Sequence, residues 1–254
     1  MVFETARQEN TKSEEVEQYE DLEIEKVGNV QLQFLHPSRI LVQGPSGSGK
    51  STMILNILKK SNKFFSTKFD HVAYFYPQQG LTESRQNYIH QLRNIFPNLE
   101  IQEDLPKLDH ILRTDGKKLL IIDDLYFEAI NSKEFLNLTI HGSSHGNCSY
   151  FLTTQNIFHQ GKYQKSIQRQ WTDVLTFPGL GDYQVLGFLS KQIFNDRSFL
   201  MDCVKWLKKN FKKQYERCLW ISMNVQQHDM EDDFRVRANF LSKPVLLFKQ
   251  KDIK

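Results

Sequence analysis

The sequence contains no long hydrophobic run and few cysteines among its 254 residues. No apolar stretch approaches the roughly 20 residues that a helix needs to cross a bilayer, and the start, Met1-Val2-Phe3-Glu4, is too polar for a signal peptide. We therefore expect a soluble intracellular protein with no membrane partner. The three cysteines, Cys148, Cys203 and Cys218, lack metal-ligand spacing and indicate buried thiols in a reducing compartment.

Acidic side chains are concentrated at the N-terminus. The first 25 residues hold nine acidic and two basic residues, a net charge of −7, and because the whole chain carries +3, the remainder carries +10. So polar and acidic a segment predicts a disordered or loosely docked tail over residues 1–28, followed by one folded domain over residues 29–254. A basic body is compatible with nucleic acid, although +10 spread over so many residues is weak support.

One glycine-rich stretch fits the phosphate-binding loop pattern G-x-x-x-x-G-K-[ST] at every fixed position. It directly follows the apolar run 40–42 and precedes a helical pattern of apolar residues, as this loop requires. Its glycines allow successive backbone N–H groups to face one anion. The predicted nucleotide-binding residues are Gly44, Pro45, Ser46, Gly47, Ser48, Gly49, Lys50, Ser51 and Thr52.

The polar residues of this loop have separate expected roles. Lys50 is expected to reach the β- and γ-phosphates of ATP, Ser51 to ligate Mg²⁺, and Thr52 to bond an inner phosphate. A helix that begins at Lys50 would direct its positive end at the same phosphates.

A second motif is the run Leu119-Leu120-Ile121-Ile122, which ends in Asp123 and Asp124. Four consecutive apolar residues are typical of a strand buried on both faces, and two carboxylates at its end match a Walker B strand. Asp123 is expected to hold Mg²⁺ opposite Ser51, and Asp124 to orient and polarise the attacking water.

Strand and helix patterns alternate along the chain, which predicts an α/β fold with a central, mostly parallel sheet flanked by helices. A further strand from Cys148 turns polar at Thr154, Gln155 and Asn156. Because ligands lie outside the carboxyl ends of parallel strands, Gln155 is expected to face the γ-phosphate as a sensor.

A predicted helix from about Ser198 to Lys212 has lysines on one side. This basic face would either contact phosphate or simply be exposed to solvent, and solvent-exposed lysine faces are the commoner case. The lysines are Lys205, Lys208, Lys209, Lys212 and Lys213.

With these motifs in place, the chain resembles the FtsK/HerA branch of P-loop ATPases. It looks most like the small genome-packaging ATPases of double-stranded DNA viruses and of Polinton/Maverick-type (adintovirus-like) elements. The resemblance covers roughly Phe34 to Phe240. It lies in His36-Pro37, the phosphate loop, the Walker B strand with Leu125, and the block from His141 to Gln160, which contains Gly-Ser-Ser-His, Thr-Thr-Gln-Asn and Phe-His-Gln.

The resemblance implies an ASCE-type, RecA-like fold in which the sensor strand lies between the Walker A and Walker B strands. It also implies a homo-oligomeric ring, a pentamer or hexamer, that moves double-stranded DNA through its pore into a capsid. A capsid or portal protein would then be a partner, and the host nucleus or a viral assembly site the location.

The family also tends to place an arginine near the subunit boundary. In this chain the aligned residue is Lys165, and Arg169 follows one turn later, so Arg169 is the favoured candidate, with Arg85 and Arg93 as alternatives. Such an arginine would stabilise transition-state charge in the neighbouring subunit.

Two other features stay open. Asp124 stands where many relatives carry the longer Glu, which leaves the water geometry open. His141 and His145 are either pore or interface contacts or plain surface residues.

The sequence thus predicts an Mg²⁺-dependent ATPase that translocates double-stranded DNA for packaging. One alternative is a P-loop nucleotide kinase, but such an enzyme normally needs no water-orienting acid after the Walker B residue and carries an arginine-rich lid, which the sequence does not show. The other is a nucleotide-switched binding module with little turnover.

Overall fold

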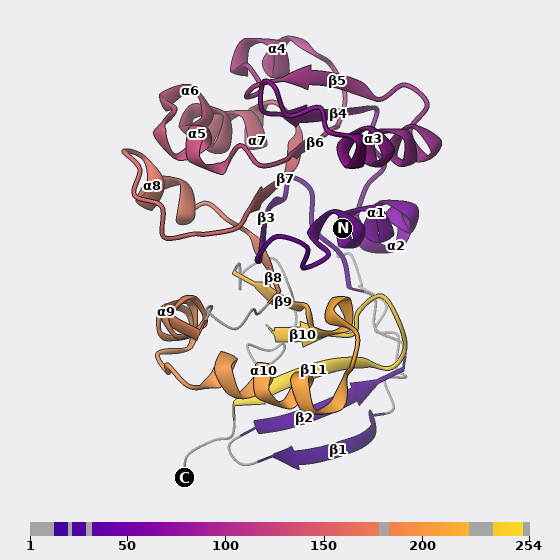
Figure 1. The fold of residues 1–254 in the computed structure, drawn as a ribbon, viewed down its shortest axis with the longest axis vertical. Coiled ribbons are helices and arrows are strands. Elements are labelled where there is room, and N and C mark those ends of the chain that lie inside the picture. The colour runs from indigo at the N-terminus through magenta and orange to yellow at the C-terminus, as the bar shows by residue number, and fades with distance from the viewer. Residues whose placement is uncertain (1–12, 20–21, 29–31, 178–182, 224–235, 251–254) are drawn as a thin grey trace, which may run out of the picture.

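The computed structural model describes residues 13–19, 22–28, 32–177, 183–223 and 236–250. Their strands form one eleven-stranded sheet in the order β1-β2-β11-β10-β9-β8-β3-β7-β6-β4-β5 (Figure 1). None of the helices in these ranges has the length and apolar character that crossing a membrane requires.

Six neighbouring strands of the sheet run parallel to one another. The strands at its centre are buried on both faces, which explains their uninterrupted apolar runs. Strand β7, the predicted sensor strand, lies between β3 and β6, the predicted Walker A and Walker B strands, so the expected strand order is confirmed. The six strands are β8 (Asp173–Thr176), β3 (Arg39–Gln43), β7 (Cys148–Thr154), β6 (Lys118–Ile122), β4 (His71–Tyr76) and β5 (Glu100–Glu103).

Beyond β8 the sheet continues with antiparallel strands. The two halves therefore meet along the β8–β9 pair, where β8 has a parallel neighbour on one side and an antiparallel one on the other. The antiparallel strands are β9 (Leu219–Ser222), β10 (Val236–Ala238), β11 (Val245–Gln250), β2 (Leu22–Val27) and β1 (Ser13–Tyr19).

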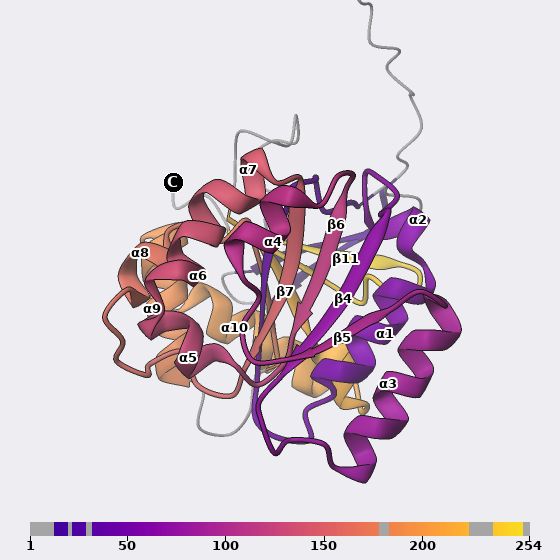
Figure 2. The same ribbon diagram turned by 90° about the horizontal axis from the view of Figure 1, so that it is seen from above.

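Helices cover both faces of the sheet and enclose two apolar cores, so the described residues form three layers (Figure 2). One face carries α1 (Lys50–Lys59), α2 (Ser61–Phe64) and α3 (Glu83–Ile95). The other carries α4 (Leu108–Arg113), α5 (Tyr126–Asn131), α6 (Lys133–Asn137), α7 (Ser143–His145), α8 (Gln164–Gln168), α9 (Tyr183–Phe194) and α10 (Phe199–Asn210). A π-helical turn, Leu138–Gly142, precedes α7, and a 3₁₀ turn, Gln214–Arg217, follows α10.

The expected disorder of residues 1–28 is wrong for the part of this segment that the structure describes. Ser13–Tyr19 and Leu22–Val27 are strands, and the second pairs with β11 along its whole length. Leu22 and Ile24 are buried in the core, whereas Glu23 and Glu25 are only partly buried. Alternation of this kind suits a half-buried strand, and the high average charge of the segment concealed it. Residues 1–12 and 20–21 lie outside the described ranges.

A buried charged cluster joins the two halves of the sheet at β8. The Asp173 carboxylate accepts a hydrogen bond of 2.7 Å from Trp220 Nε1 on β9, and the guanidinium of Arg237 on β10 lies 4.9 Å from the Trp220 ring. Burial raises the pKa of Asp173 to about 6, although Trp220, Thr172, Arg237 and Arg39 all oppose the rise.

The raised pKa of Asp173 predicts that the free energy of unfolding falls as pH rises. The unfolded carboxyl titrates near pH 4 and the folded one near 6, so between these values the folded chain holds a proton that the unfolded chain has lost. This group should make the free energy of unfolding about 2 kcal/mol larger at pH 4 than at pH 7. Asp173→Asn keeps an acceptor for Trp220 but cannot titrate. Urea denaturation between pH 4 and 7 measures the free energy of unfolding of both proteins. The advantage of wild type over the variant should shrink as pH rises. If the two free energies change in parallel with pH, the raised pKa of Asp173 is refuted.

Candidate nucleotide-binding site

The glycine-rich loop connects β3 to α1 in a conformation that glycine makes possible. Gly49, the residue before α1, has φ of 97°, in the left-handed region that favours glycine. At Gly44 a Cβ atom would lie 2.7 Å from the Cβ of Phe177 and 2.8 Å from Ser48 Oγ. No side chain caps the N-terminus of α1. The first turn of this ten-residue helix therefore presents backbone N–H groups to an anion.

Lys50 is the first residue of α1, and its side chain folds back over the loop. Its ammonium group donates hydrogen bonds to the carbonyl oxygens of Gly44, at 2.7 Å, and Pro45, at 3.0 Å. Lys50 is nearly buried. The positive charge is thus held at the loop that would receive phosphates.

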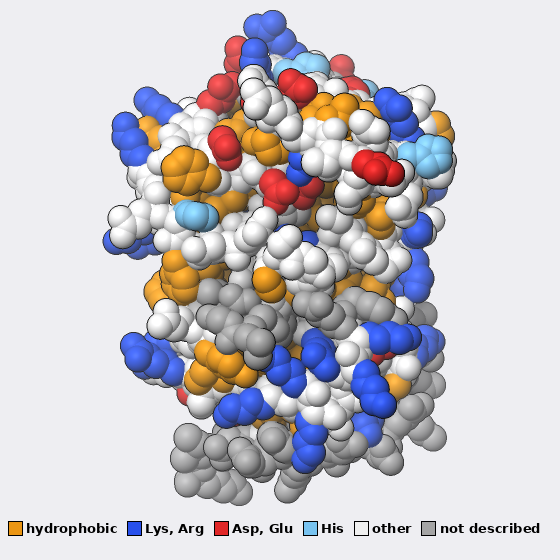
Figure 3. Space-filling model, viewed as in Figure 1, with side chains coloured by type: hydrophobic (Ala, Val, Ile, Leu, Met, Phe, Trp, Pro, Cys, Tyr) orange, Lys and Arg blue, Asp and Glu red, His pale blue; other side chains and the backbone are white. Residues whose placement is uncertain are grey.

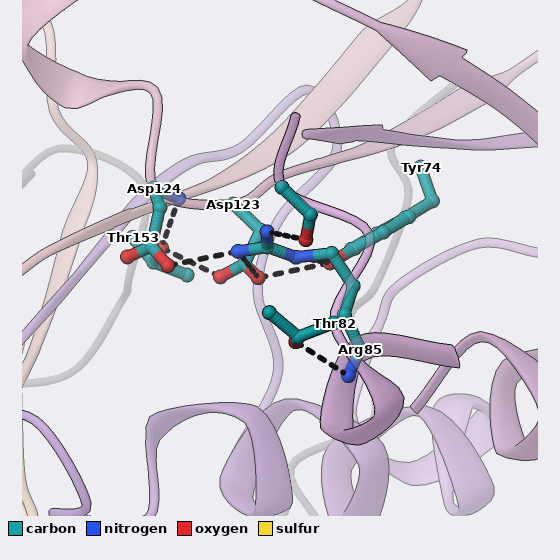
Figure 4. Close-up of polar contacts among 7 residues, drawn as sticks. Tyr74, Thr82, Arg85, Asp123, Asp124 and Thr153 are labelled. Atoms are coloured by element: carbon teal, nitrogen blue, oxygen red, sulfur yellow. Dashed lines mark hydrogen bonds and ion pairs between the residues drawn. The ribbon is translucent and has the colours of Figure 1, made fainter. Parts of the chain in front are cut away.

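Asp123 follows β6 and is held from both sides of its strand (Figure 4). Tyr74 of β4 donates its hydroxyl to Oδ2 at 2.9 Å, and Thr153 of β7 donates its hydroxyl to Oδ1 at 2.8 Å. Both carboxylate oxygens therefore have fixed partners on neighbouring strands, which sets the orientation of the side chain.

Asp124 has a backbone conformation unusual for a residue other than glycine, with φ of 57°. Its N–H donates to Thr153 Oγ1 at 2.9 Å, which ties this strained residue to β7. Burial and the neighbouring Asp123 raise the pKa of Asp124, while Arg85 and Lys50 oppose the rise. Its side chain is 41% exposed, against 13% for Asp123, so Asp124 is the more accessible of the two carboxylates.

One cavity of about 1000 Å³ brings the predicted residues together. On the face of the molecule that Figure 3 shows, acidic side chains lie in a hollow in the upper half. Gly44 and Pro45 belong to the loop beneath the cavity but do not line it. The predicted residues that do line it are Ser46, Gly47, Ser48, Gly49, Lys50, Ser51, Thr52, Asp123, Asp124 and Gln155.

The candidate arginines lie in different places. Arg169 follows α8, is exposed, and does not line the cavity of its own chain. Its role toward a neighbouring subunit stays a prediction. Arg93, near the end of α3, is also exposed and outside the cavity, whereas Arg85 at the start of α3 lines it.

His141 and His145 lie far from the predicted phosphate site. Their rings stack at 6.3 Å, just before the first residue of β7. Gln155 follows the last residue of the same strand, so the two histidines occupy the opposite edge of the sheet.

Two residues of the cavity region, Tyr74 and Thr153, were not predicted from the sequence, and Arg85 was named only as an alternative arginine near a subunit boundary. A hydroxyl in the middle of a buried strand is a signal that could have identified Thr153 and Tyr74, since such groups need a hydrogen-bonding partner. Arg85 carries no such local signal. It reaches Asp123 because β4 lies next to β6, and this neighbour relation is a property of the sheet.

The site residues fit a magnesium-bound nucleotide. The Ser51 hydroxyl and the Asp123 carboxylate supply the hard oxygen donors that Mg²⁺ takes, usually as one or two protein ligands beside phosphates. No cluster of three or more metal-binding side chains occurs among the described residues, and magnesium held in this way needs none. The buried Ser48 hydroxyl has no partner within the described chain and lines the same cavity.

No family model and no curated protein matches the chain. The structure is similar to the genome packaging NTPase B204 from Sulfolobus turreted icosahedral virus 2. In complex with AMP, that protein is 16% identical, with a TM-score of 0.47, over 77% of this chain and 98% of that chain. In complex with sulfate, it is 18% identical, with a TM-score of 0.48, over 75% of this chain and 93% of that chain. The KaiC-like protein PH0186 from Pyrococcus horikoshii is 14% identical, with a TM-score of 0.35, over 55% and 70%. Likeness of this size says nothing about the ligand or partner of this chain.

Thr153 should matter for metal-dependent nucleotide binding more than for folding. Thr153→Val removes the hydroxyl that holds Asp123 and the Asp124 N–H, and we expect affinity for ATP with Mg²⁺ to fall about tenfold. A fluorescent ATP analogue titrated with and without Mg²⁺ measures this. Ser149→Ala is the matched control, because it removes a buried, hydrogen-bonded hydroxyl from the other end of β7. Equal losses in the two variants would contradict the role of Thr153.

Proposed function

We propose that the protein is an Mg²⁺-dependent ATPase of the FtsK/HerA type that translocates double-stranded DNA, for packaging into a preformed capsid. One observation carries the enzymatic part: the phosphate loop, both acids after β6 and Gln155 after β7 line one cavity at one edge of the sheet.

Each lining residue has a distinct role in this proposal. The loop N–H groups and Lys50 bind the phosphates, and Ser51 and Asp123 hold the metal ion. Bound Mg²⁺ supplies positive charge beside the transferred phosphoryl group. Asp124, the more exposed acid, orients the attacking water and takes up its proton. Gln155 contacts the γ-phosphate and relays its presence along β7.

The site favours hydrolysis over transfer to a second nucleotide. Asp124 lines the cavity directly after Asp123, where an ATPase needs a group to activate water. Arg85 is the only arginine among the described residues that line the cavity, and it is ion-paired with both acids. A kinase would use several arginines to bind its two substrates.

The basic face of α10 supports DNA as the partner. Apolar residues of this helix are buried, while Lys205 and Lys209 are exposed and Lys208 lies over the Tyr183 ring. The helix ends at Asn210, so Lys212 and Lys213, which are also exposed, follow it. Figure 3 shows lysine and arginine side chains grouped on the lower half of the face that also holds the acidic hollow, in the region of α10. Contacts made by lysine are mainly to phosphate, so we expect weak dependence on DNA sequence and strong dependence on salt.

The proposed motor is a ring of five or six copies at a viral assembly site, with a capsid or portal protein as partner. In such a ring Arg169 acts on the nucleotide of the neighbouring copy. Its exposure and its place outside the cavity of its own chain are compatible with that role.

Hydrolysis should depend on Lys50 and respond to DNA. We expect ATP turnover to rise severalfold with long duplex DNA, and Lys50→Ala to lower it at least about 100-fold because a charge that stabilises the transition state is lost. DNA affinity should stay within about twofold. Phosphate release, measured with and without DNA, tests both expectations.

The control for this experiment is Lys68→Ala, since Lys68 is exposed and does not line the cavity. Unchanged turnover in Lys50→Ala would refute the phosphate-site assignment. Phosphate transfer to a nucleotide without net hydrolysis would indicate a kinase, and negligible turnover with tight ATP binding would indicate a nucleotide-switched module.

The lysines of α10 and of the residues just after it should contribute to the salt dependence of DNA binding. Replacement of Lys208, Lys209 and Lys212 by Ala should reduce the slope of log affinity against log salt by about 2 to 3, since each phosphate contact contributes about 0.9. Fluorescence anisotropy with a labelled duplex measures the slope. The matched control replaces the exposed residues Lys68, Lys107 and Lys133. If both triple variants change the slope equally, α10 is not the DNA surface.

A further inference from the structure

Arg85 points into the cavity and contacts both acids of the Walker B motif (Figure 4). Its Nη2 atom lies 2.9 Å from Asp124 Oδ2 and 3.5 Å from Asp123 Oδ2. Its Nε donates to the Tyr74 hydroxyl at 3.2 Å, and its Nη1 donates to the carbonyl oxygen of Gly80. The side chain is 13% exposed, so this charge is largely removed from solvent.

The backbone around Arg85 leaves room for the guanidinium. A Cβ atom at Gly80 would overlap with Arg85 Nη1 and lie 2.8 Å from the carbonyl oxygen of Pro77. Thr82 caps α3 and accepts the Arg85 N–H at 3.3 Å, which fixes the start of the helix independently of the arginine side chain. The segment 77–85 is thus shaped to present one arginine to the two acids.

Arg85 lies against the carboxylate of Asp123 that would hold a metal ion. Of the two Asp123 oxygens, Oδ1 receives Thr153, and Oδ2 receives Tyr74 and faces Arg85. A divalent cation bound to Asp123 would meet the guanidinium charge a few ångströms away, and like charges at that distance repel strongly. Arg85 and the metal ion therefore compete for this carboxylate.

We propose that Arg85 is a positioning residue that serves as the internal counter-cation of Asp123 and Asp124. It holds both carboxylates before nucleotide binds, gives up Asp123 to the metal ion that arrives with ATP, and retains Asp124 in place for the water. This inference rests on the proposed function, because it assumes that Asp123 is a metal ligand. It predicts two opposite effects of removing the arginine: tighter metal binding without nucleotide, and slower hydrolysis.

A purely structural arginine would not produce this pair of effects. If Arg85 only fastened α3 to the end of β4, its removal would loosen the site, and both metal binding and hydrolysis would weaken together. Metal affinity in the absence of nucleotide is therefore the readout that separates the two roles.

The test measures Mn²⁺ binding to the full chain by electron paramagnetic resonance, without nucleotide and with ADP. Arg85→Gln should bind Mn²⁺ about tenfold more tightly than wild type without nucleotide, since a neighbouring positive charge is gone, and its ATP turnover should fall at least about tenfold. Arg113→Gln, at an exposed arginine of α4 outside the cavity, should match wild type in both measurements.

Unchanged or weaker Mn²⁺ binding by a cooperatively folded Arg85→Gln would overturn the inference. If that variant does not fold, Arg85→Lys is used instead, because the shorter lysine side chain reaches fewer of the four partners of Arg85. Its affinity for Mn²⁺ should rise about threefold, and no rise would overturn the inference. The proposed function fails in a different way: wild type itself would then neither bind Mn²⁺ with ADP nor hydrolyse ATP.

Discussion

The two hydrogen bonds that hold Asp123 depend on the order of the strands. Tyr74 reaches Asp123 from β4 and Thr153 reaches it from β7, and both can do so only because β6 lies between these two strands. The same order places β3, with its phosphate loop, on the far side of β7. A parallel sheet brings the carboxyl ends of all these strands to one edge. The site is therefore a consequence of strand order as much as of the individual residues.

Local motifs were enough to predict the residues attached directly to strand ends. Asp123 and Gln155 could be placed because each follows a strand, and Lys50 because it closes the loop after one; the edge they share follows from parallel pairing. Arg85 was foreseen only as a possible contact between subunits, since its position in the cavity depends on how the segment 77–85 returns over the sheet. Tyr74 looked like an ordinary core residue, because the chain pattern does not show which side chain faces the neighbouring strand.

The N-terminal strands show a different limit of prediction from sequence. Net charge averages over a segment, whereas a strand with one buried face needs apolar residues only at alternate positions. Leu22 and Ile24 satisfy that need while Glu23 and Glu25 carry the charge. The partner strand β11 comes from the other end of the chain, so no local pattern could reveal the pairing. Long-range pairing, and not composition, orders this segment.

Charge balance accounts for the arrangement of the proposed site before nucleotide binds. Asp123 and Asp124 are adjacent in the chain, and burial together with the charge of Asp123 raises the pKa of Asp124. Lys50 and Arg85 bring two positive charges to the same cavity from two different helices. The lysine is bonded to loop carbonyl groups and the arginine to the acids, so the two cations are not equivalent. Incoming phosphates can attract Lys50 without disturbing the acids, whereas a metal ion at Asp123 has to replace interactions of Arg85. Under the proposed function, nucleotide and metal would therefore act on separate cations, and this separation would let the acids stay ordered while the phosphate site fills.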